Sequence, residues 1–439
     1  MRFGTDGLRG VAGAELTPEL ALALGRAAAR VLGADQWFVG RDPRRSGALL
    51  SAAFVAGLAA EGAEVADLGV LPTPGVAFWA EAEGAPAAVV SASHNPFADN
   101  GIKLFGPGGR KLSDDIERRI ELELHAGATL RSGLDLGTVA PFDGARRYAD
   151  HLSGTLEGRS LTGLRVVIDT AHGAAAGLGQ TVLRGLGCDV VAVLGDAPDG
   201  VNINLGCGST HLGPLADAVL AAGADVGIAL DGDADRCLAV DHRGQVVDGD
   251  QLLALLALDL RARGRLDRDT LVVTVMSNLG LHLAMAEAGV HLETTAVGDR
   301  YVLDRMEEGG FALGGEQSGH VIVRRLATTG DGLLSALQVL DVMHRTGRPL
   351  AELAGVVQRL PQVLVNVRVA GSAKEALAGS EAVWAAVAQV QSELGDHGRV
   401  LLRPSGTEPL VRVMVEAPTD ALAREAAARI AKVVEATLA

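Results

Sequence analysis

Short runs of apolar, often β-branched residues alternate with longer alanine- and leucine-rich stretches along the whole chain, and this alternation constrains the fold most. The short runs predict strands at Trp37–Val39, Ala87–Val90, Arg165–Asp169, Val226–Leu230, Leu271–Val275, Val363–Val369 and Val411–Glu416. The longer stretches predict helices at Pro18–Leu32, Asp114–His125, Leu212–Ala222, Gln251–Arg263, Gly332–Arg345 and Thr419–Thr437. Strand–helix alternation is typical of βαβ units, and continuously apolar strands are typical of parallel sheets covered on both faces. The pattern predicts an α/β protein with mostly parallel sheets.

The length and the breaks in this pattern predict several domains. A chain of 439 residues corresponds to about three domains. Changes in composition near residues 152–158, 249–251 and 360–362 divide it into four segments: 1–153, 154–250, 251–361 and 362–439. The first three segments share the strand–helix alternation, and the fourth is smaller and rich in strands.

One arrangement recurs without a sequence repeat: a buried run, a polar glycine-containing loop and then an expected helix. It occurs at VVSASHNP, VVIDTAHG, IALDGDADR and ALGGEQSGH. Because ligands of α/β proteins bind at the carboxyl ends of strands, these loops are the candidate binding sites.

Composition excludes several classes of function. The net charge of −15 argues against a general nucleic-acid-binding protein, although local arginines can hold a small phosphorylated substrate. Three cysteines, far apart and without CxxC spacing, fit a reducing cytoplasm and no zinc site. The chain has neither a signal-like apolar segment at its start nor an apolar run as long as a membrane span. We therefore expect a soluble, cytoplasmic protein without nucleic-acid or membrane partners.

The segment LDGDADR places Asp231, Asp233 and Asp235 at alternate positions directly after an apolar run. Their carboxylates would share one face of an extended segment, or converge on one cation in a tight loop. Two like charges 4 Å apart repel by about 4 kcal/mol at an effective dielectric constant near 20, and a divalent ion removes that cost. Oxygen ligands favour Mg²⁺. A solvated acidic turn or a structural calcium loop is the alternative, but the spacing does not fit an EF-hand.

Two further loops suit a phosphorylated sugar. In LLRPSGTEPLVRV, the Ser405, Gly406 and Thr407 backbone and hydroxyl groups form a candidate anion cradle, flanked by Arg403 and Arg412. In GGEQSGH, the alternating polar residues suit sugar hydroxyls; they are Glu316, Ser318 and His320. An ordinary turn and a helix-entry turn are the alternative interpretations of these two loops.

The stretch SASHNPFADNGIK combines Ser93 with Lys103, one of only four lysines in the chain. No GxSxG motif surrounds Ser93, which argues against a hydrolase nucleophile. A serine near a lysine, together with an aspartate-rich metal loop, favours phosphoryl transfer. A turn hydroxyl remains the alternative. Loops GTDGLRG and GRDPRRSG add Arg9 and Arg41, each of which would equally serve as a surface ion-pair partner.

Taken together, SASHNP with NGIK, DGDADR, GEQSGH and RPSGTEP resemble the α-D-phosphohexomutase family over the whole chain. This resemblance implies three mixed α/β domains and a C-terminal α+β domain around a central cleft. It implies that Ser93 is carried as a phosphoserine and that Mg²⁺ bridges it to the three aspartates. His94, Lys103 and Arg9 would neutralise charge and assist proton transfer. The GEQSGH loop would hold the sugar, and the RPSGTEP loop with Arg412 would hold the non-reacting phosphate.

The opening MRFGTDGLRG, Gln317 in GEQSGH, and GCGSTH favour the branch that interconverts glucosamine 6-phosphate and glucosamine 1-phosphate. That branch feeds the synthesis of UDP-N-acetylglucosamine and the cell wall. Pro43 departs from the commoner threonine but leaves Arg41 and Asp42 in place. The resemblance implies a 1,6-bisphosphate intermediate, with glucosamine or glucose 1,6-bisphosphate as primer.

Several alternatives stay open. The same chemistry on glucose or mannose phosphates is the nearest, followed by a metal-dependent sugar phosphatase and by a non-catalytic sugar-phosphate or cation-binding protein. An activating Ser/Thr kinase and self-priming are both open routes to phosphoserine. A homodimer is also open, because the sequence does not reveal the oligomeric state.

Overall fold

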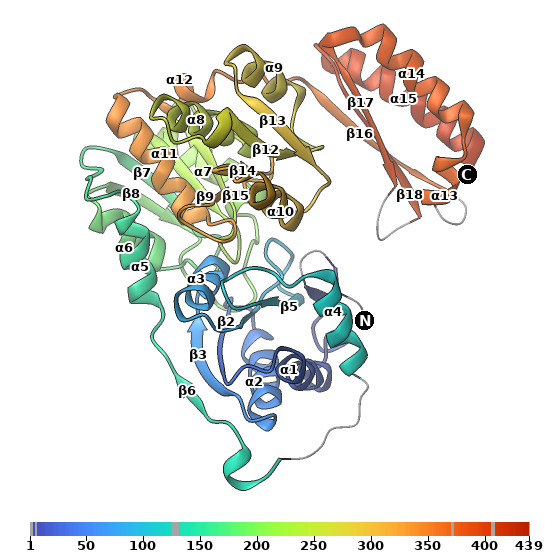
Figure 1. Ribbon diagram of the computed structural model, residues 1–439. Helices are drawn as coiled ribbons and strands as arrows, with labels where there is room; N and C mark the ends of the chain where they lie inside the picture. The colour runs from blue at the N-terminus through green and yellow to red at the C-terminus, as the bar shows by residue number, and fades with distance from the viewer. Residues whose placement is uncertain (1–2, 5–6, 125–130, 370–372, 405–408, 439) are drawn as a thin grey trace. The chain divides into compact units, whose positions relative to one another are not determined.

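Four β-sheets organise the part of the chain that the computed structural model describes, residues 3–4, 7–124, 131–369, 373–404 and 409–438 (Figure 1). The chain forms two compact units. One comprises Met1–Met276 and Gly289–Val356, and the other comprises Ser277–Ala288 and Val357–Ala439. Within the described ranges, no helix combines the length and apolarity needed to cross a membrane.

The first sheet has six strands in the order β1-β5-β4-β2-β3-β6. In that order they span Leu8–Val11, Asp99–Phe105, Ala87–Val90, Gln36–Arg41, Glu64–Val70 and Val139–Pro141. The accompanying helices are α1 (Pro18–Leu32), α2 (Gly47–Ala60), α3 (Thr73–Glu83) and α4 (Asp114–Glu123). Alternate residues of β2 face opposite sides: Trp37 and Val39 join the core beneath α1 and α2, whereas Phe38 stacks on Trp79 of α3. Helices therefore cover both faces of this sheet.

The second sheet has the order β11-β10-β9-β7-β8, and the third has the order β13-β12-β14-β15. The second sheet comprises β7 (Arg165–Asp169), β8 (Asp189–Leu194), β9 (Val226–Leu230), β10 (Cys237–Asp241) and β11 (Val246–Val247), with α5 (Ala145–Gly154), α6 (Leu178–Gly185) and α7 (Gly213–Ala222). The third comprises β12 (Thr270–Thr274), β13 (His291–Thr295), β14 (Leu313–Gly315) and β15 (Val321–Val323), with α8 (Gly249–Ala262), α10 (Asp299–Gly309), α11 (Gly332–Thr346) and α12 (Leu350–Ala354).

These three sheets repeat one topology. Four consecutive strands lie in the order second, first, third, fourth: β3-β2-β4-β5, β8-β7-β9-β10 and β13-β12-β14-β15. The first three strands are parallel, and the fourth is antiparallel to the third. The expectation of a helix after each polar loop is therefore wrong for three of the four loops. A strand follows SASHNP, LDGDADR and GEQSGH, and only VVIDTAHG leads to a helix, α6.

The second compact unit is an α+β structure. Its antiparallel sheet has the order β16-β18-β17, spanning Gln362–Arg368, Leu410–Glu416 and Arg399–Pro404. Its helices are α9 (Leu279–Glu287), α13 (Ala373–Ala378), α14 (Glu381–Leu394) and α15 (Asp420–Leu438). Alternate residues of β18, Val411, Val413 and Val415, form its core with Ala427 and Ile430 of α15. The expected fold class, three mixed α/β domains and a C-terminal α+β domain, is confirmed.

Local sequence signals explain why the best-predicted elements have their observed bounds. Helix α1 begins where the Thr17 side chain accepts the Leu20 N–H, and it ends at Gly33, which is left-handed at φ +61°. It crosses α2 closely: a Cβ at Gly25 would lie 2.1 Å from the Phe54 carbonyl oxygen. Strands β4, β7 and β9 have the predicted bounds, and the core is built mainly of alanine, valine and leucine, since only 3% of residues are aromatic.

Candidate active site

The repeated topology brings two of the candidate loops into contact. SASHNP lies between β4 and β5, and LDGDADR lies between β9 and β10. The Ser93 hydroxyl donates a hydrogen bond of 2.5 Å to Asp231 Oδ2, although the two residues are 138 positions apart. Both side chains are buried. A hydrogen bond this short shows that the Ser93 oxygen lies at the edge of the aspartate cluster.

The Ser93 backbone is held in an unusual conformation, with φ at +52°. Its N–H donates to Ser91 Oγ at 3.0 Å, and that hydroxyl donates to Asp42 at 2.6 Å. The completely buried Arg44 guanidinium pairs with Asp42 at 2.8 Å and donates to the main-chain carbonyls of the loop. Those carbonyls belong to Ser93 (2.8 Å), Asn95 (2.9 Å), Asp99 (3.1 Å) and Pro96. Arg44 thus fixes the path of the loop around Ser93.

Sequence reasoning missed Arg44 as a site residue. It singled out Arg41 from the same GRDPRRSG segment, but Arg41 pairs with Asp67 at 3.7 Å. A second missed residue is Asn204, whose Nδ2 also donates to the Ser93 carbonyl, at 2.9 Å. The only available signal was the position of Arg44 in a polar loop at the carboxyl end of β2.

Asp231, Asp233 and Asp235 converge as expected. All three are buried, and each contributes an oxygen atom within 4.8 Å of the others. Their loop is tight, with Ala234 at φ +57°. Burial, reinforced by Asp235 and Asp233, raises the pKa of Asp231 well above its usual range. Carboxylates crowded in this way repel one another unless a cation or a proton lies between them.

The residues at this cluster fit a hard divalent cation. Asp233 Oδ1 is buried and has no hydrogen-bond partner among the described residues, so it is available as a ligand. The donor set consists of oxygen atoms alone, which suits Mg²⁺ better than a transition metal. Thr73 fixes the loop, since its hydroxyl donates to Asp233 Oδ2 at 2.6 Å and its N–H to the Asp233 carbonyl at 2.9 Å.

Three predicted cationic or titratable residues lie at the serine and aspartate loops or on the strands beside them. Lys103 Nζ lies 2.7 Å from Asp233 and 3.1 Å from Asp235. His94 Nδ1 lies 3.2 Å from the Ser93 hydroxyl oxygen. Burial, assisted by Arg236 and Arg9, lowers the pKa of His94 to about 4, which leaves a neutral imidazole next to the hydroxyl. Arg9 stands on β1, directly opposite Gly101 of β5.

The GEQSGH loop lies against the aspartate loop. The Cys237 N–H donates to the Gly319 carbonyl at 2.9 Å, and His320 Nδ1 lies 3.8 Å from Asp235. Burial alone would lower the pKa of His320, but Asp235 and Asp299 outweigh burial and raise it. Glu316 accepts the Gly298 N–H at 3.2 Å.

The free polar groups of this loop are available to a ligand. Ser318 Oγ and Gln317 Nε2 are buried and have no hydrogen-bond partner within the described ranges. Buried polar groups normally find partners, so these two atoms fit a site that a polar ligand completes.

The candidate phosphate-binding residues belong to the second unit. Arg403 on β17 pairs in register with Arg412 on β18. Burial, together with Arg412, lowers the pKa of Arg403. Two neighbouring guanidinium groups of this kind are favourable for an anion. The predicted Ser405, Gly406 and Thr407 lie outside the described residues.

Comparison with known proteins supports the pattern of domains. The phosphoglucomutase/phosphomannomutase family matches in four consecutive stretches: α/β/α domain I at residues 1–131, domain II at 146–244, domain III at 248–360 and the C-terminal domain at 364–433.

Individual relatives agree with these matches. A phosphoglucosamine mutase of Saccharopolyspora erythraea is 56% identical over 442 residues, covering 99% of each chain. A solved phosphoglucomutase/phosphomannomutase family protein of Burkholderia thailandensis has a TM-score of 0.81 at 26% identity, covering 99% of this chain and 97% of its own. A putative phosphomannomutase of Thermus thermophilus has a TM-score of 0.80 at 26% identity, covering 99% of each chain. The chain therefore belongs to the phosphoglucomutase/phosphomannomutase family, the α-D-phosphohexomutases that its motifs resemble.

Proposed function

We propose that this protein interconverts glucosamine 6-phosphate and glucosamine 1-phosphate through phospho-Ser93 and a 1,6-bisphosphate intermediate. One observation carries the chemistry: the Ser93 hydroxyl lies 2.5 Å from Asp231 in a buried cluster of three carboxylates. The choice of sugar is supported by the full-length relative named phosphoglucosamine mutase at 56% identity. A reversible reaction of this kind would supply a hexosamine 1-phosphate for nucleotide-sugar and cell-wall synthesis.

In the first step, phospho-Ser93 transfers its phosphoryl group to the 1-hydroxyl of glucosamine 6-phosphate. The bond between phosphorus and the Ser93 oxygen breaks, and a bond to the sugar oxygen forms. After the bisphosphate turns over, the Ser93 oxygen takes the 6-phosphoryl group and releases glucosamine 1-phosphate. Phosphoserine carries about −1.5 to −2 charges near neutral pH, next to three aspartates. Mg²⁺ bound by Ser93, Asp231, Asp233 and Asp235 would neutralise this charge and polarise the phosphoryl group.

The residues around Ser93 have separate proposed roles. His94, with its pKa near 4, is neutral at the operating pH and is placed 3.2 Å from the Ser93 oxygen to accept or return a proton. Lys103 holds Asp233 and Asp235 and adds a positive charge beside the transferring group. Arg9, whose charge contributes to the low pKa of His94, is proposed to balance the phosphate charge.

The substrate would be held at both ends. Glu316, Ser318 and His320 are the proposed ligands of the sugar hydroxyls, and the unpartnered Ser318 Oγ supports this role. The proposed ligands of the non-reacting phosphate are Arg403, Ser405, Gly406, Thr407 and Arg412. Water exclusion around the phosphoserine would protect it from hydrolysis.

The remaining expectations complete the proposal. We propose domain boundaries at 153/154, 250/251 and 361/362, supported by the separate sheets on either side of each boundary; the first falls at the end of α5 and the second at the start of α8. The sparse, odd set of cysteines supports a cytoplasmic location.

Glucosamine or glucose 1,6-bisphosphate is the proposed primer. A Ser/Thr kinase remains an alternative route to phosphoserine, and a homodimer is the proposed assembly to test.

The decisive test is parallel turnover of glucosamine, glucose and mannose 6-phosphates with Mg²⁺ and a 1,6-bisphosphate primer. Formation of the 1-phosphate and release of free phosphate are measured together. Preference for the glucosamine ester is the expected result. Preference for glucose or mannose would keep the reaction and overturn the sugar, whereas release of free phosphate without isomerisation would indicate a phosphatase.

A substitution of the proposed nucleophile tests the chemistry separately. Ser93→Ala should abolish turnover and the phosphoryl adduct in the intact mass, while thermal unfolding stays close to wild type. Ser113→Ala is the matched control and should retain the adduct, because Ser113 is exposed and its side chain makes no hydrogen bond to cap α4. Full activity of Ser93→Ala would overturn the assignment.

A further inference from the structure

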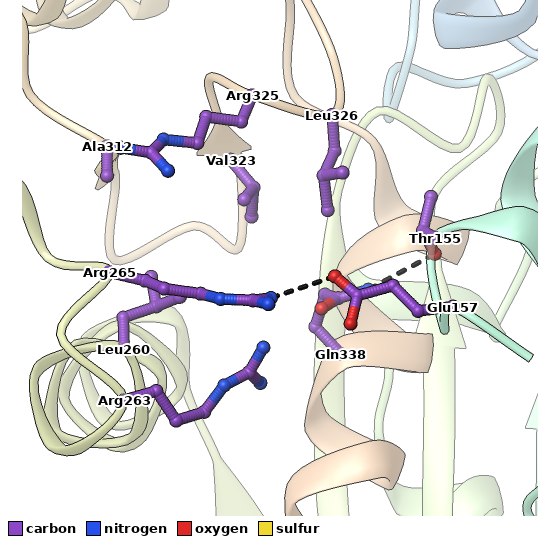
Figure 2. A pocket seen from close by; sticks show the side chains of 10 residues that line it. All are labelled: Thr155, Glu157, Leu260, Arg263, Arg265, Ala312, Val323, Arg325, Leu326 and Gln338. Atoms are coloured by element: carbon purple, nitrogen blue, oxygen red, sulfur yellow. Dashed lines mark hydrogen bonds and ion pairs between the residues drawn. The ribbon is translucent and has the colours of Figure 1, made fainter. Parts of the chain in front are cut away.

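The first unit contains a pocket that is lined by none of the candidate active-site residues (Figure 2). Its volume is about 290 Å³. The end of α8, the segment following α5, the β14–β15 region and α11 each contribute side chains to it. Ligand pockets typically begin near 300 Å³, so this space suits a molecule of the size of a sugar phosphate or nucleotide.

Three arginines line the pocket in a chain whose net charge is −15. Figure 2 shows the guanidinium groups of Arg263 and Arg265 directed into the same space, while Arg325 comes from the segment after β15. Glu157 is the one acidic residue of the lining, and its carboxylate pairs with Arg265 at 2.9 Å, so three positive charges face one negative charge in this pocket. The pocket is therefore suited to an anion.

The carboxylates nearby do not balance these arginines. Two separate sets of ion pairs hold the arginines of this region. The first set joins four arginines to three carboxylates: Arg159, Arg263, Arg265, Arg345, Glu157, Asp259 and Asp341. The second set joins Arg324 and Arg325 to Asp267. Hydrogen bonds from Arg265 and Arg159 lower the pKa of the exposed Glu157 to about 2, as expected in a positive environment. Each set keeps an excess of one positive charge.

The remaining lining separates an apolar wall from polar groups. Leu260, Ala312, Val323 and Leu326 form the apolar part, in which Ala312 and Val323 are buried. Gln338 donates to the Thr155 hydroxyl at 3.2 Å, so this polar pair is already oriented at the pocket. An inorganic ion would use only the arginines, whereas an organic phosphate would also cover the apolar wall.

We propose that this pocket binds a phosphate monoester that carries a ring of sugar or nucleoside size. The phosphoryl oxygens accept hydrogen bonds from the guanidinium groups of Arg263 and Arg265, which each offer five N–H donors in a planar fork, and Arg325 adds positive charge to the lining. The ring covers the apolar wall and reaches the Thr155–Gln338 pair. This site is additional to the mutase site and does not depend on the proposed reaction.

The test is isothermal titration of the full-length protein with AMP, UMP and ribose 5-phosphate, which are not hexose phosphates. Inorganic phosphate is titrated for comparison. We expect at least one monoester to bind with a Kd below about 1 mM and more tightly than inorganic phosphate. Failure of all three monoesters to bind, or equal binding of inorganic phosphate, would overturn the proposal.

Paired variants locate the binding. Arg265→Gln with Arg325→Gln removes two half-exposed guanidinium groups and should raise the monoester Kd roughly tenfold or more. Arg118→Gln with Arg424→Gln is the control, because these exposed arginines each pair with a carboxylate of their own helix. Equal effects of the two double variants would place the bound monoester elsewhere and overturn the site.

A third variant guards against loss of folding. Gln338→Glu keeps the size of the side chain and adds a negative charge to a region with excess arginine, so stability should be retained while the monoester binds more weakly. Unchanged binding in this variant would contradict the pocket. Mutase turnover should stay within about twofold of wild type in all pocket variants, which separates this site from the proposed active site.

Discussion

Gly232 faces Ser93 so closely that a Cβ atom at position 232 would lie 2.6 Å from the Ser93 carbonyl oxygen. The same atom would lie 2.8 Å from Ile203 Cδ1 and 2.9 Å from Asn204 Nδ2. Gly232 belongs to the aspartate loop, whereas Ser93 belongs to the serine loop of another sheet. The absence of a side chain at this one position allows the two loops to approach within hydrogen-bonding distance.

Replacing Gly232 with alanine should therefore separate the serine and aspartate loops. A misplacement approaching 1 Å lowers catalysis by roughly 10²-fold, and overpacking costs about 1–3 kcal/mol of stability. Steady-state turnover and thermal unfolding measure the two effects. Gly213→Ala is the control, because a Cβ at Gly213 would meet no atom within 4 Å. Wild-type turnover in Gly232→Ala would show that the contact does not matter.

Arg44 provides a second test, as a residue that positions the serine loop through its main chain. Arg44→Lys keeps a positive charge beside Asp42 but loses the planar fork that reaches several carbonyls. We expect kcat to fall by roughly 10²-fold with little change in KM, because the substrate ligands are untouched. Stability should fall by about 2 kcal/mol, since buried carbonyls lose donors.

The neighbouring Arg45→Lys is the matched control for this variant. The Arg45 side chain is exposed, and its backbone N–H, which donates to the Gly200 carbonyl at 2.8 Å, is unaffected by the substitution. Its kinetics should resemble those of the wild type. If kcat of Arg44→Lys fell no further than that of Arg45→Lys, Arg44 would have only a structural role.

The contrast between the aspartates and Arg44 shows which parts of the site the sequence predicts. Asp231, Asp233 and Asp235 are recognisable because their ligating atoms come from one short segment after a buried strand. Arg44 is not recognisable, because it acts on main-chain carbonyls 49 to 55 positions away. Main-chain acceptors are present at every residue and leave no pattern in the sequence.

The strands likewise include some that are recognisable from the sequence and others that are not. The parallel strands β4 and β9 were predicted because burial on both faces makes them continuously apolar, whereas the partly exposed parallel strands β3, β8 and β13 were missed. The antiparallel strands β5 and β10 were missed because each follows a polar loop that equally suits a helix. The placement of α9 in the second unit was also missed, since it rests on long-range contacts such as Asn278 Nδ2 with the Leu360 carbonyl at 3.0 Å.

The aspartate cluster should lower the stability of the metal-free protein and bind a cation. Asp231→Asn removes one of three crowded carboxylates, so in EDTA we expect this variant to be more stable than wild type by about 1–2 kcal/mol. Added Mg²⁺ should raise the unfolding temperature of the wild type but not of the variant, and turnover should be lost. Thermal unfolding with and without Mg²⁺ measures both effects. Asp217→Asn, at an exposed position of α7, is the charge-matched control. Equal stabilisation of both variants by Mg²⁺ would place the cation elsewhere.

Asp331 should make stability depend on pH. Burial raises its pKa from 3.8 to about 6, although it accepts the Leu334 N–H at 2.9 Å and the Tyr148 hydroxyl at 2.8 Å. Because the folded state holds this proton more tightly, the stabilisation is present at low pH and lost as pH rises through about 6. Asp331→Asn lacks this loss, so its stability relative to wild type should increase by about 2 kcal/mol between pH 4 and pH 7. Urea unfolding across that range measures the difference. The control Asp217→Asn should follow the wild type. If the stability of Asp331→Asn changed with pH in parallel with that of the wild type, the raised pKa would be contradicted.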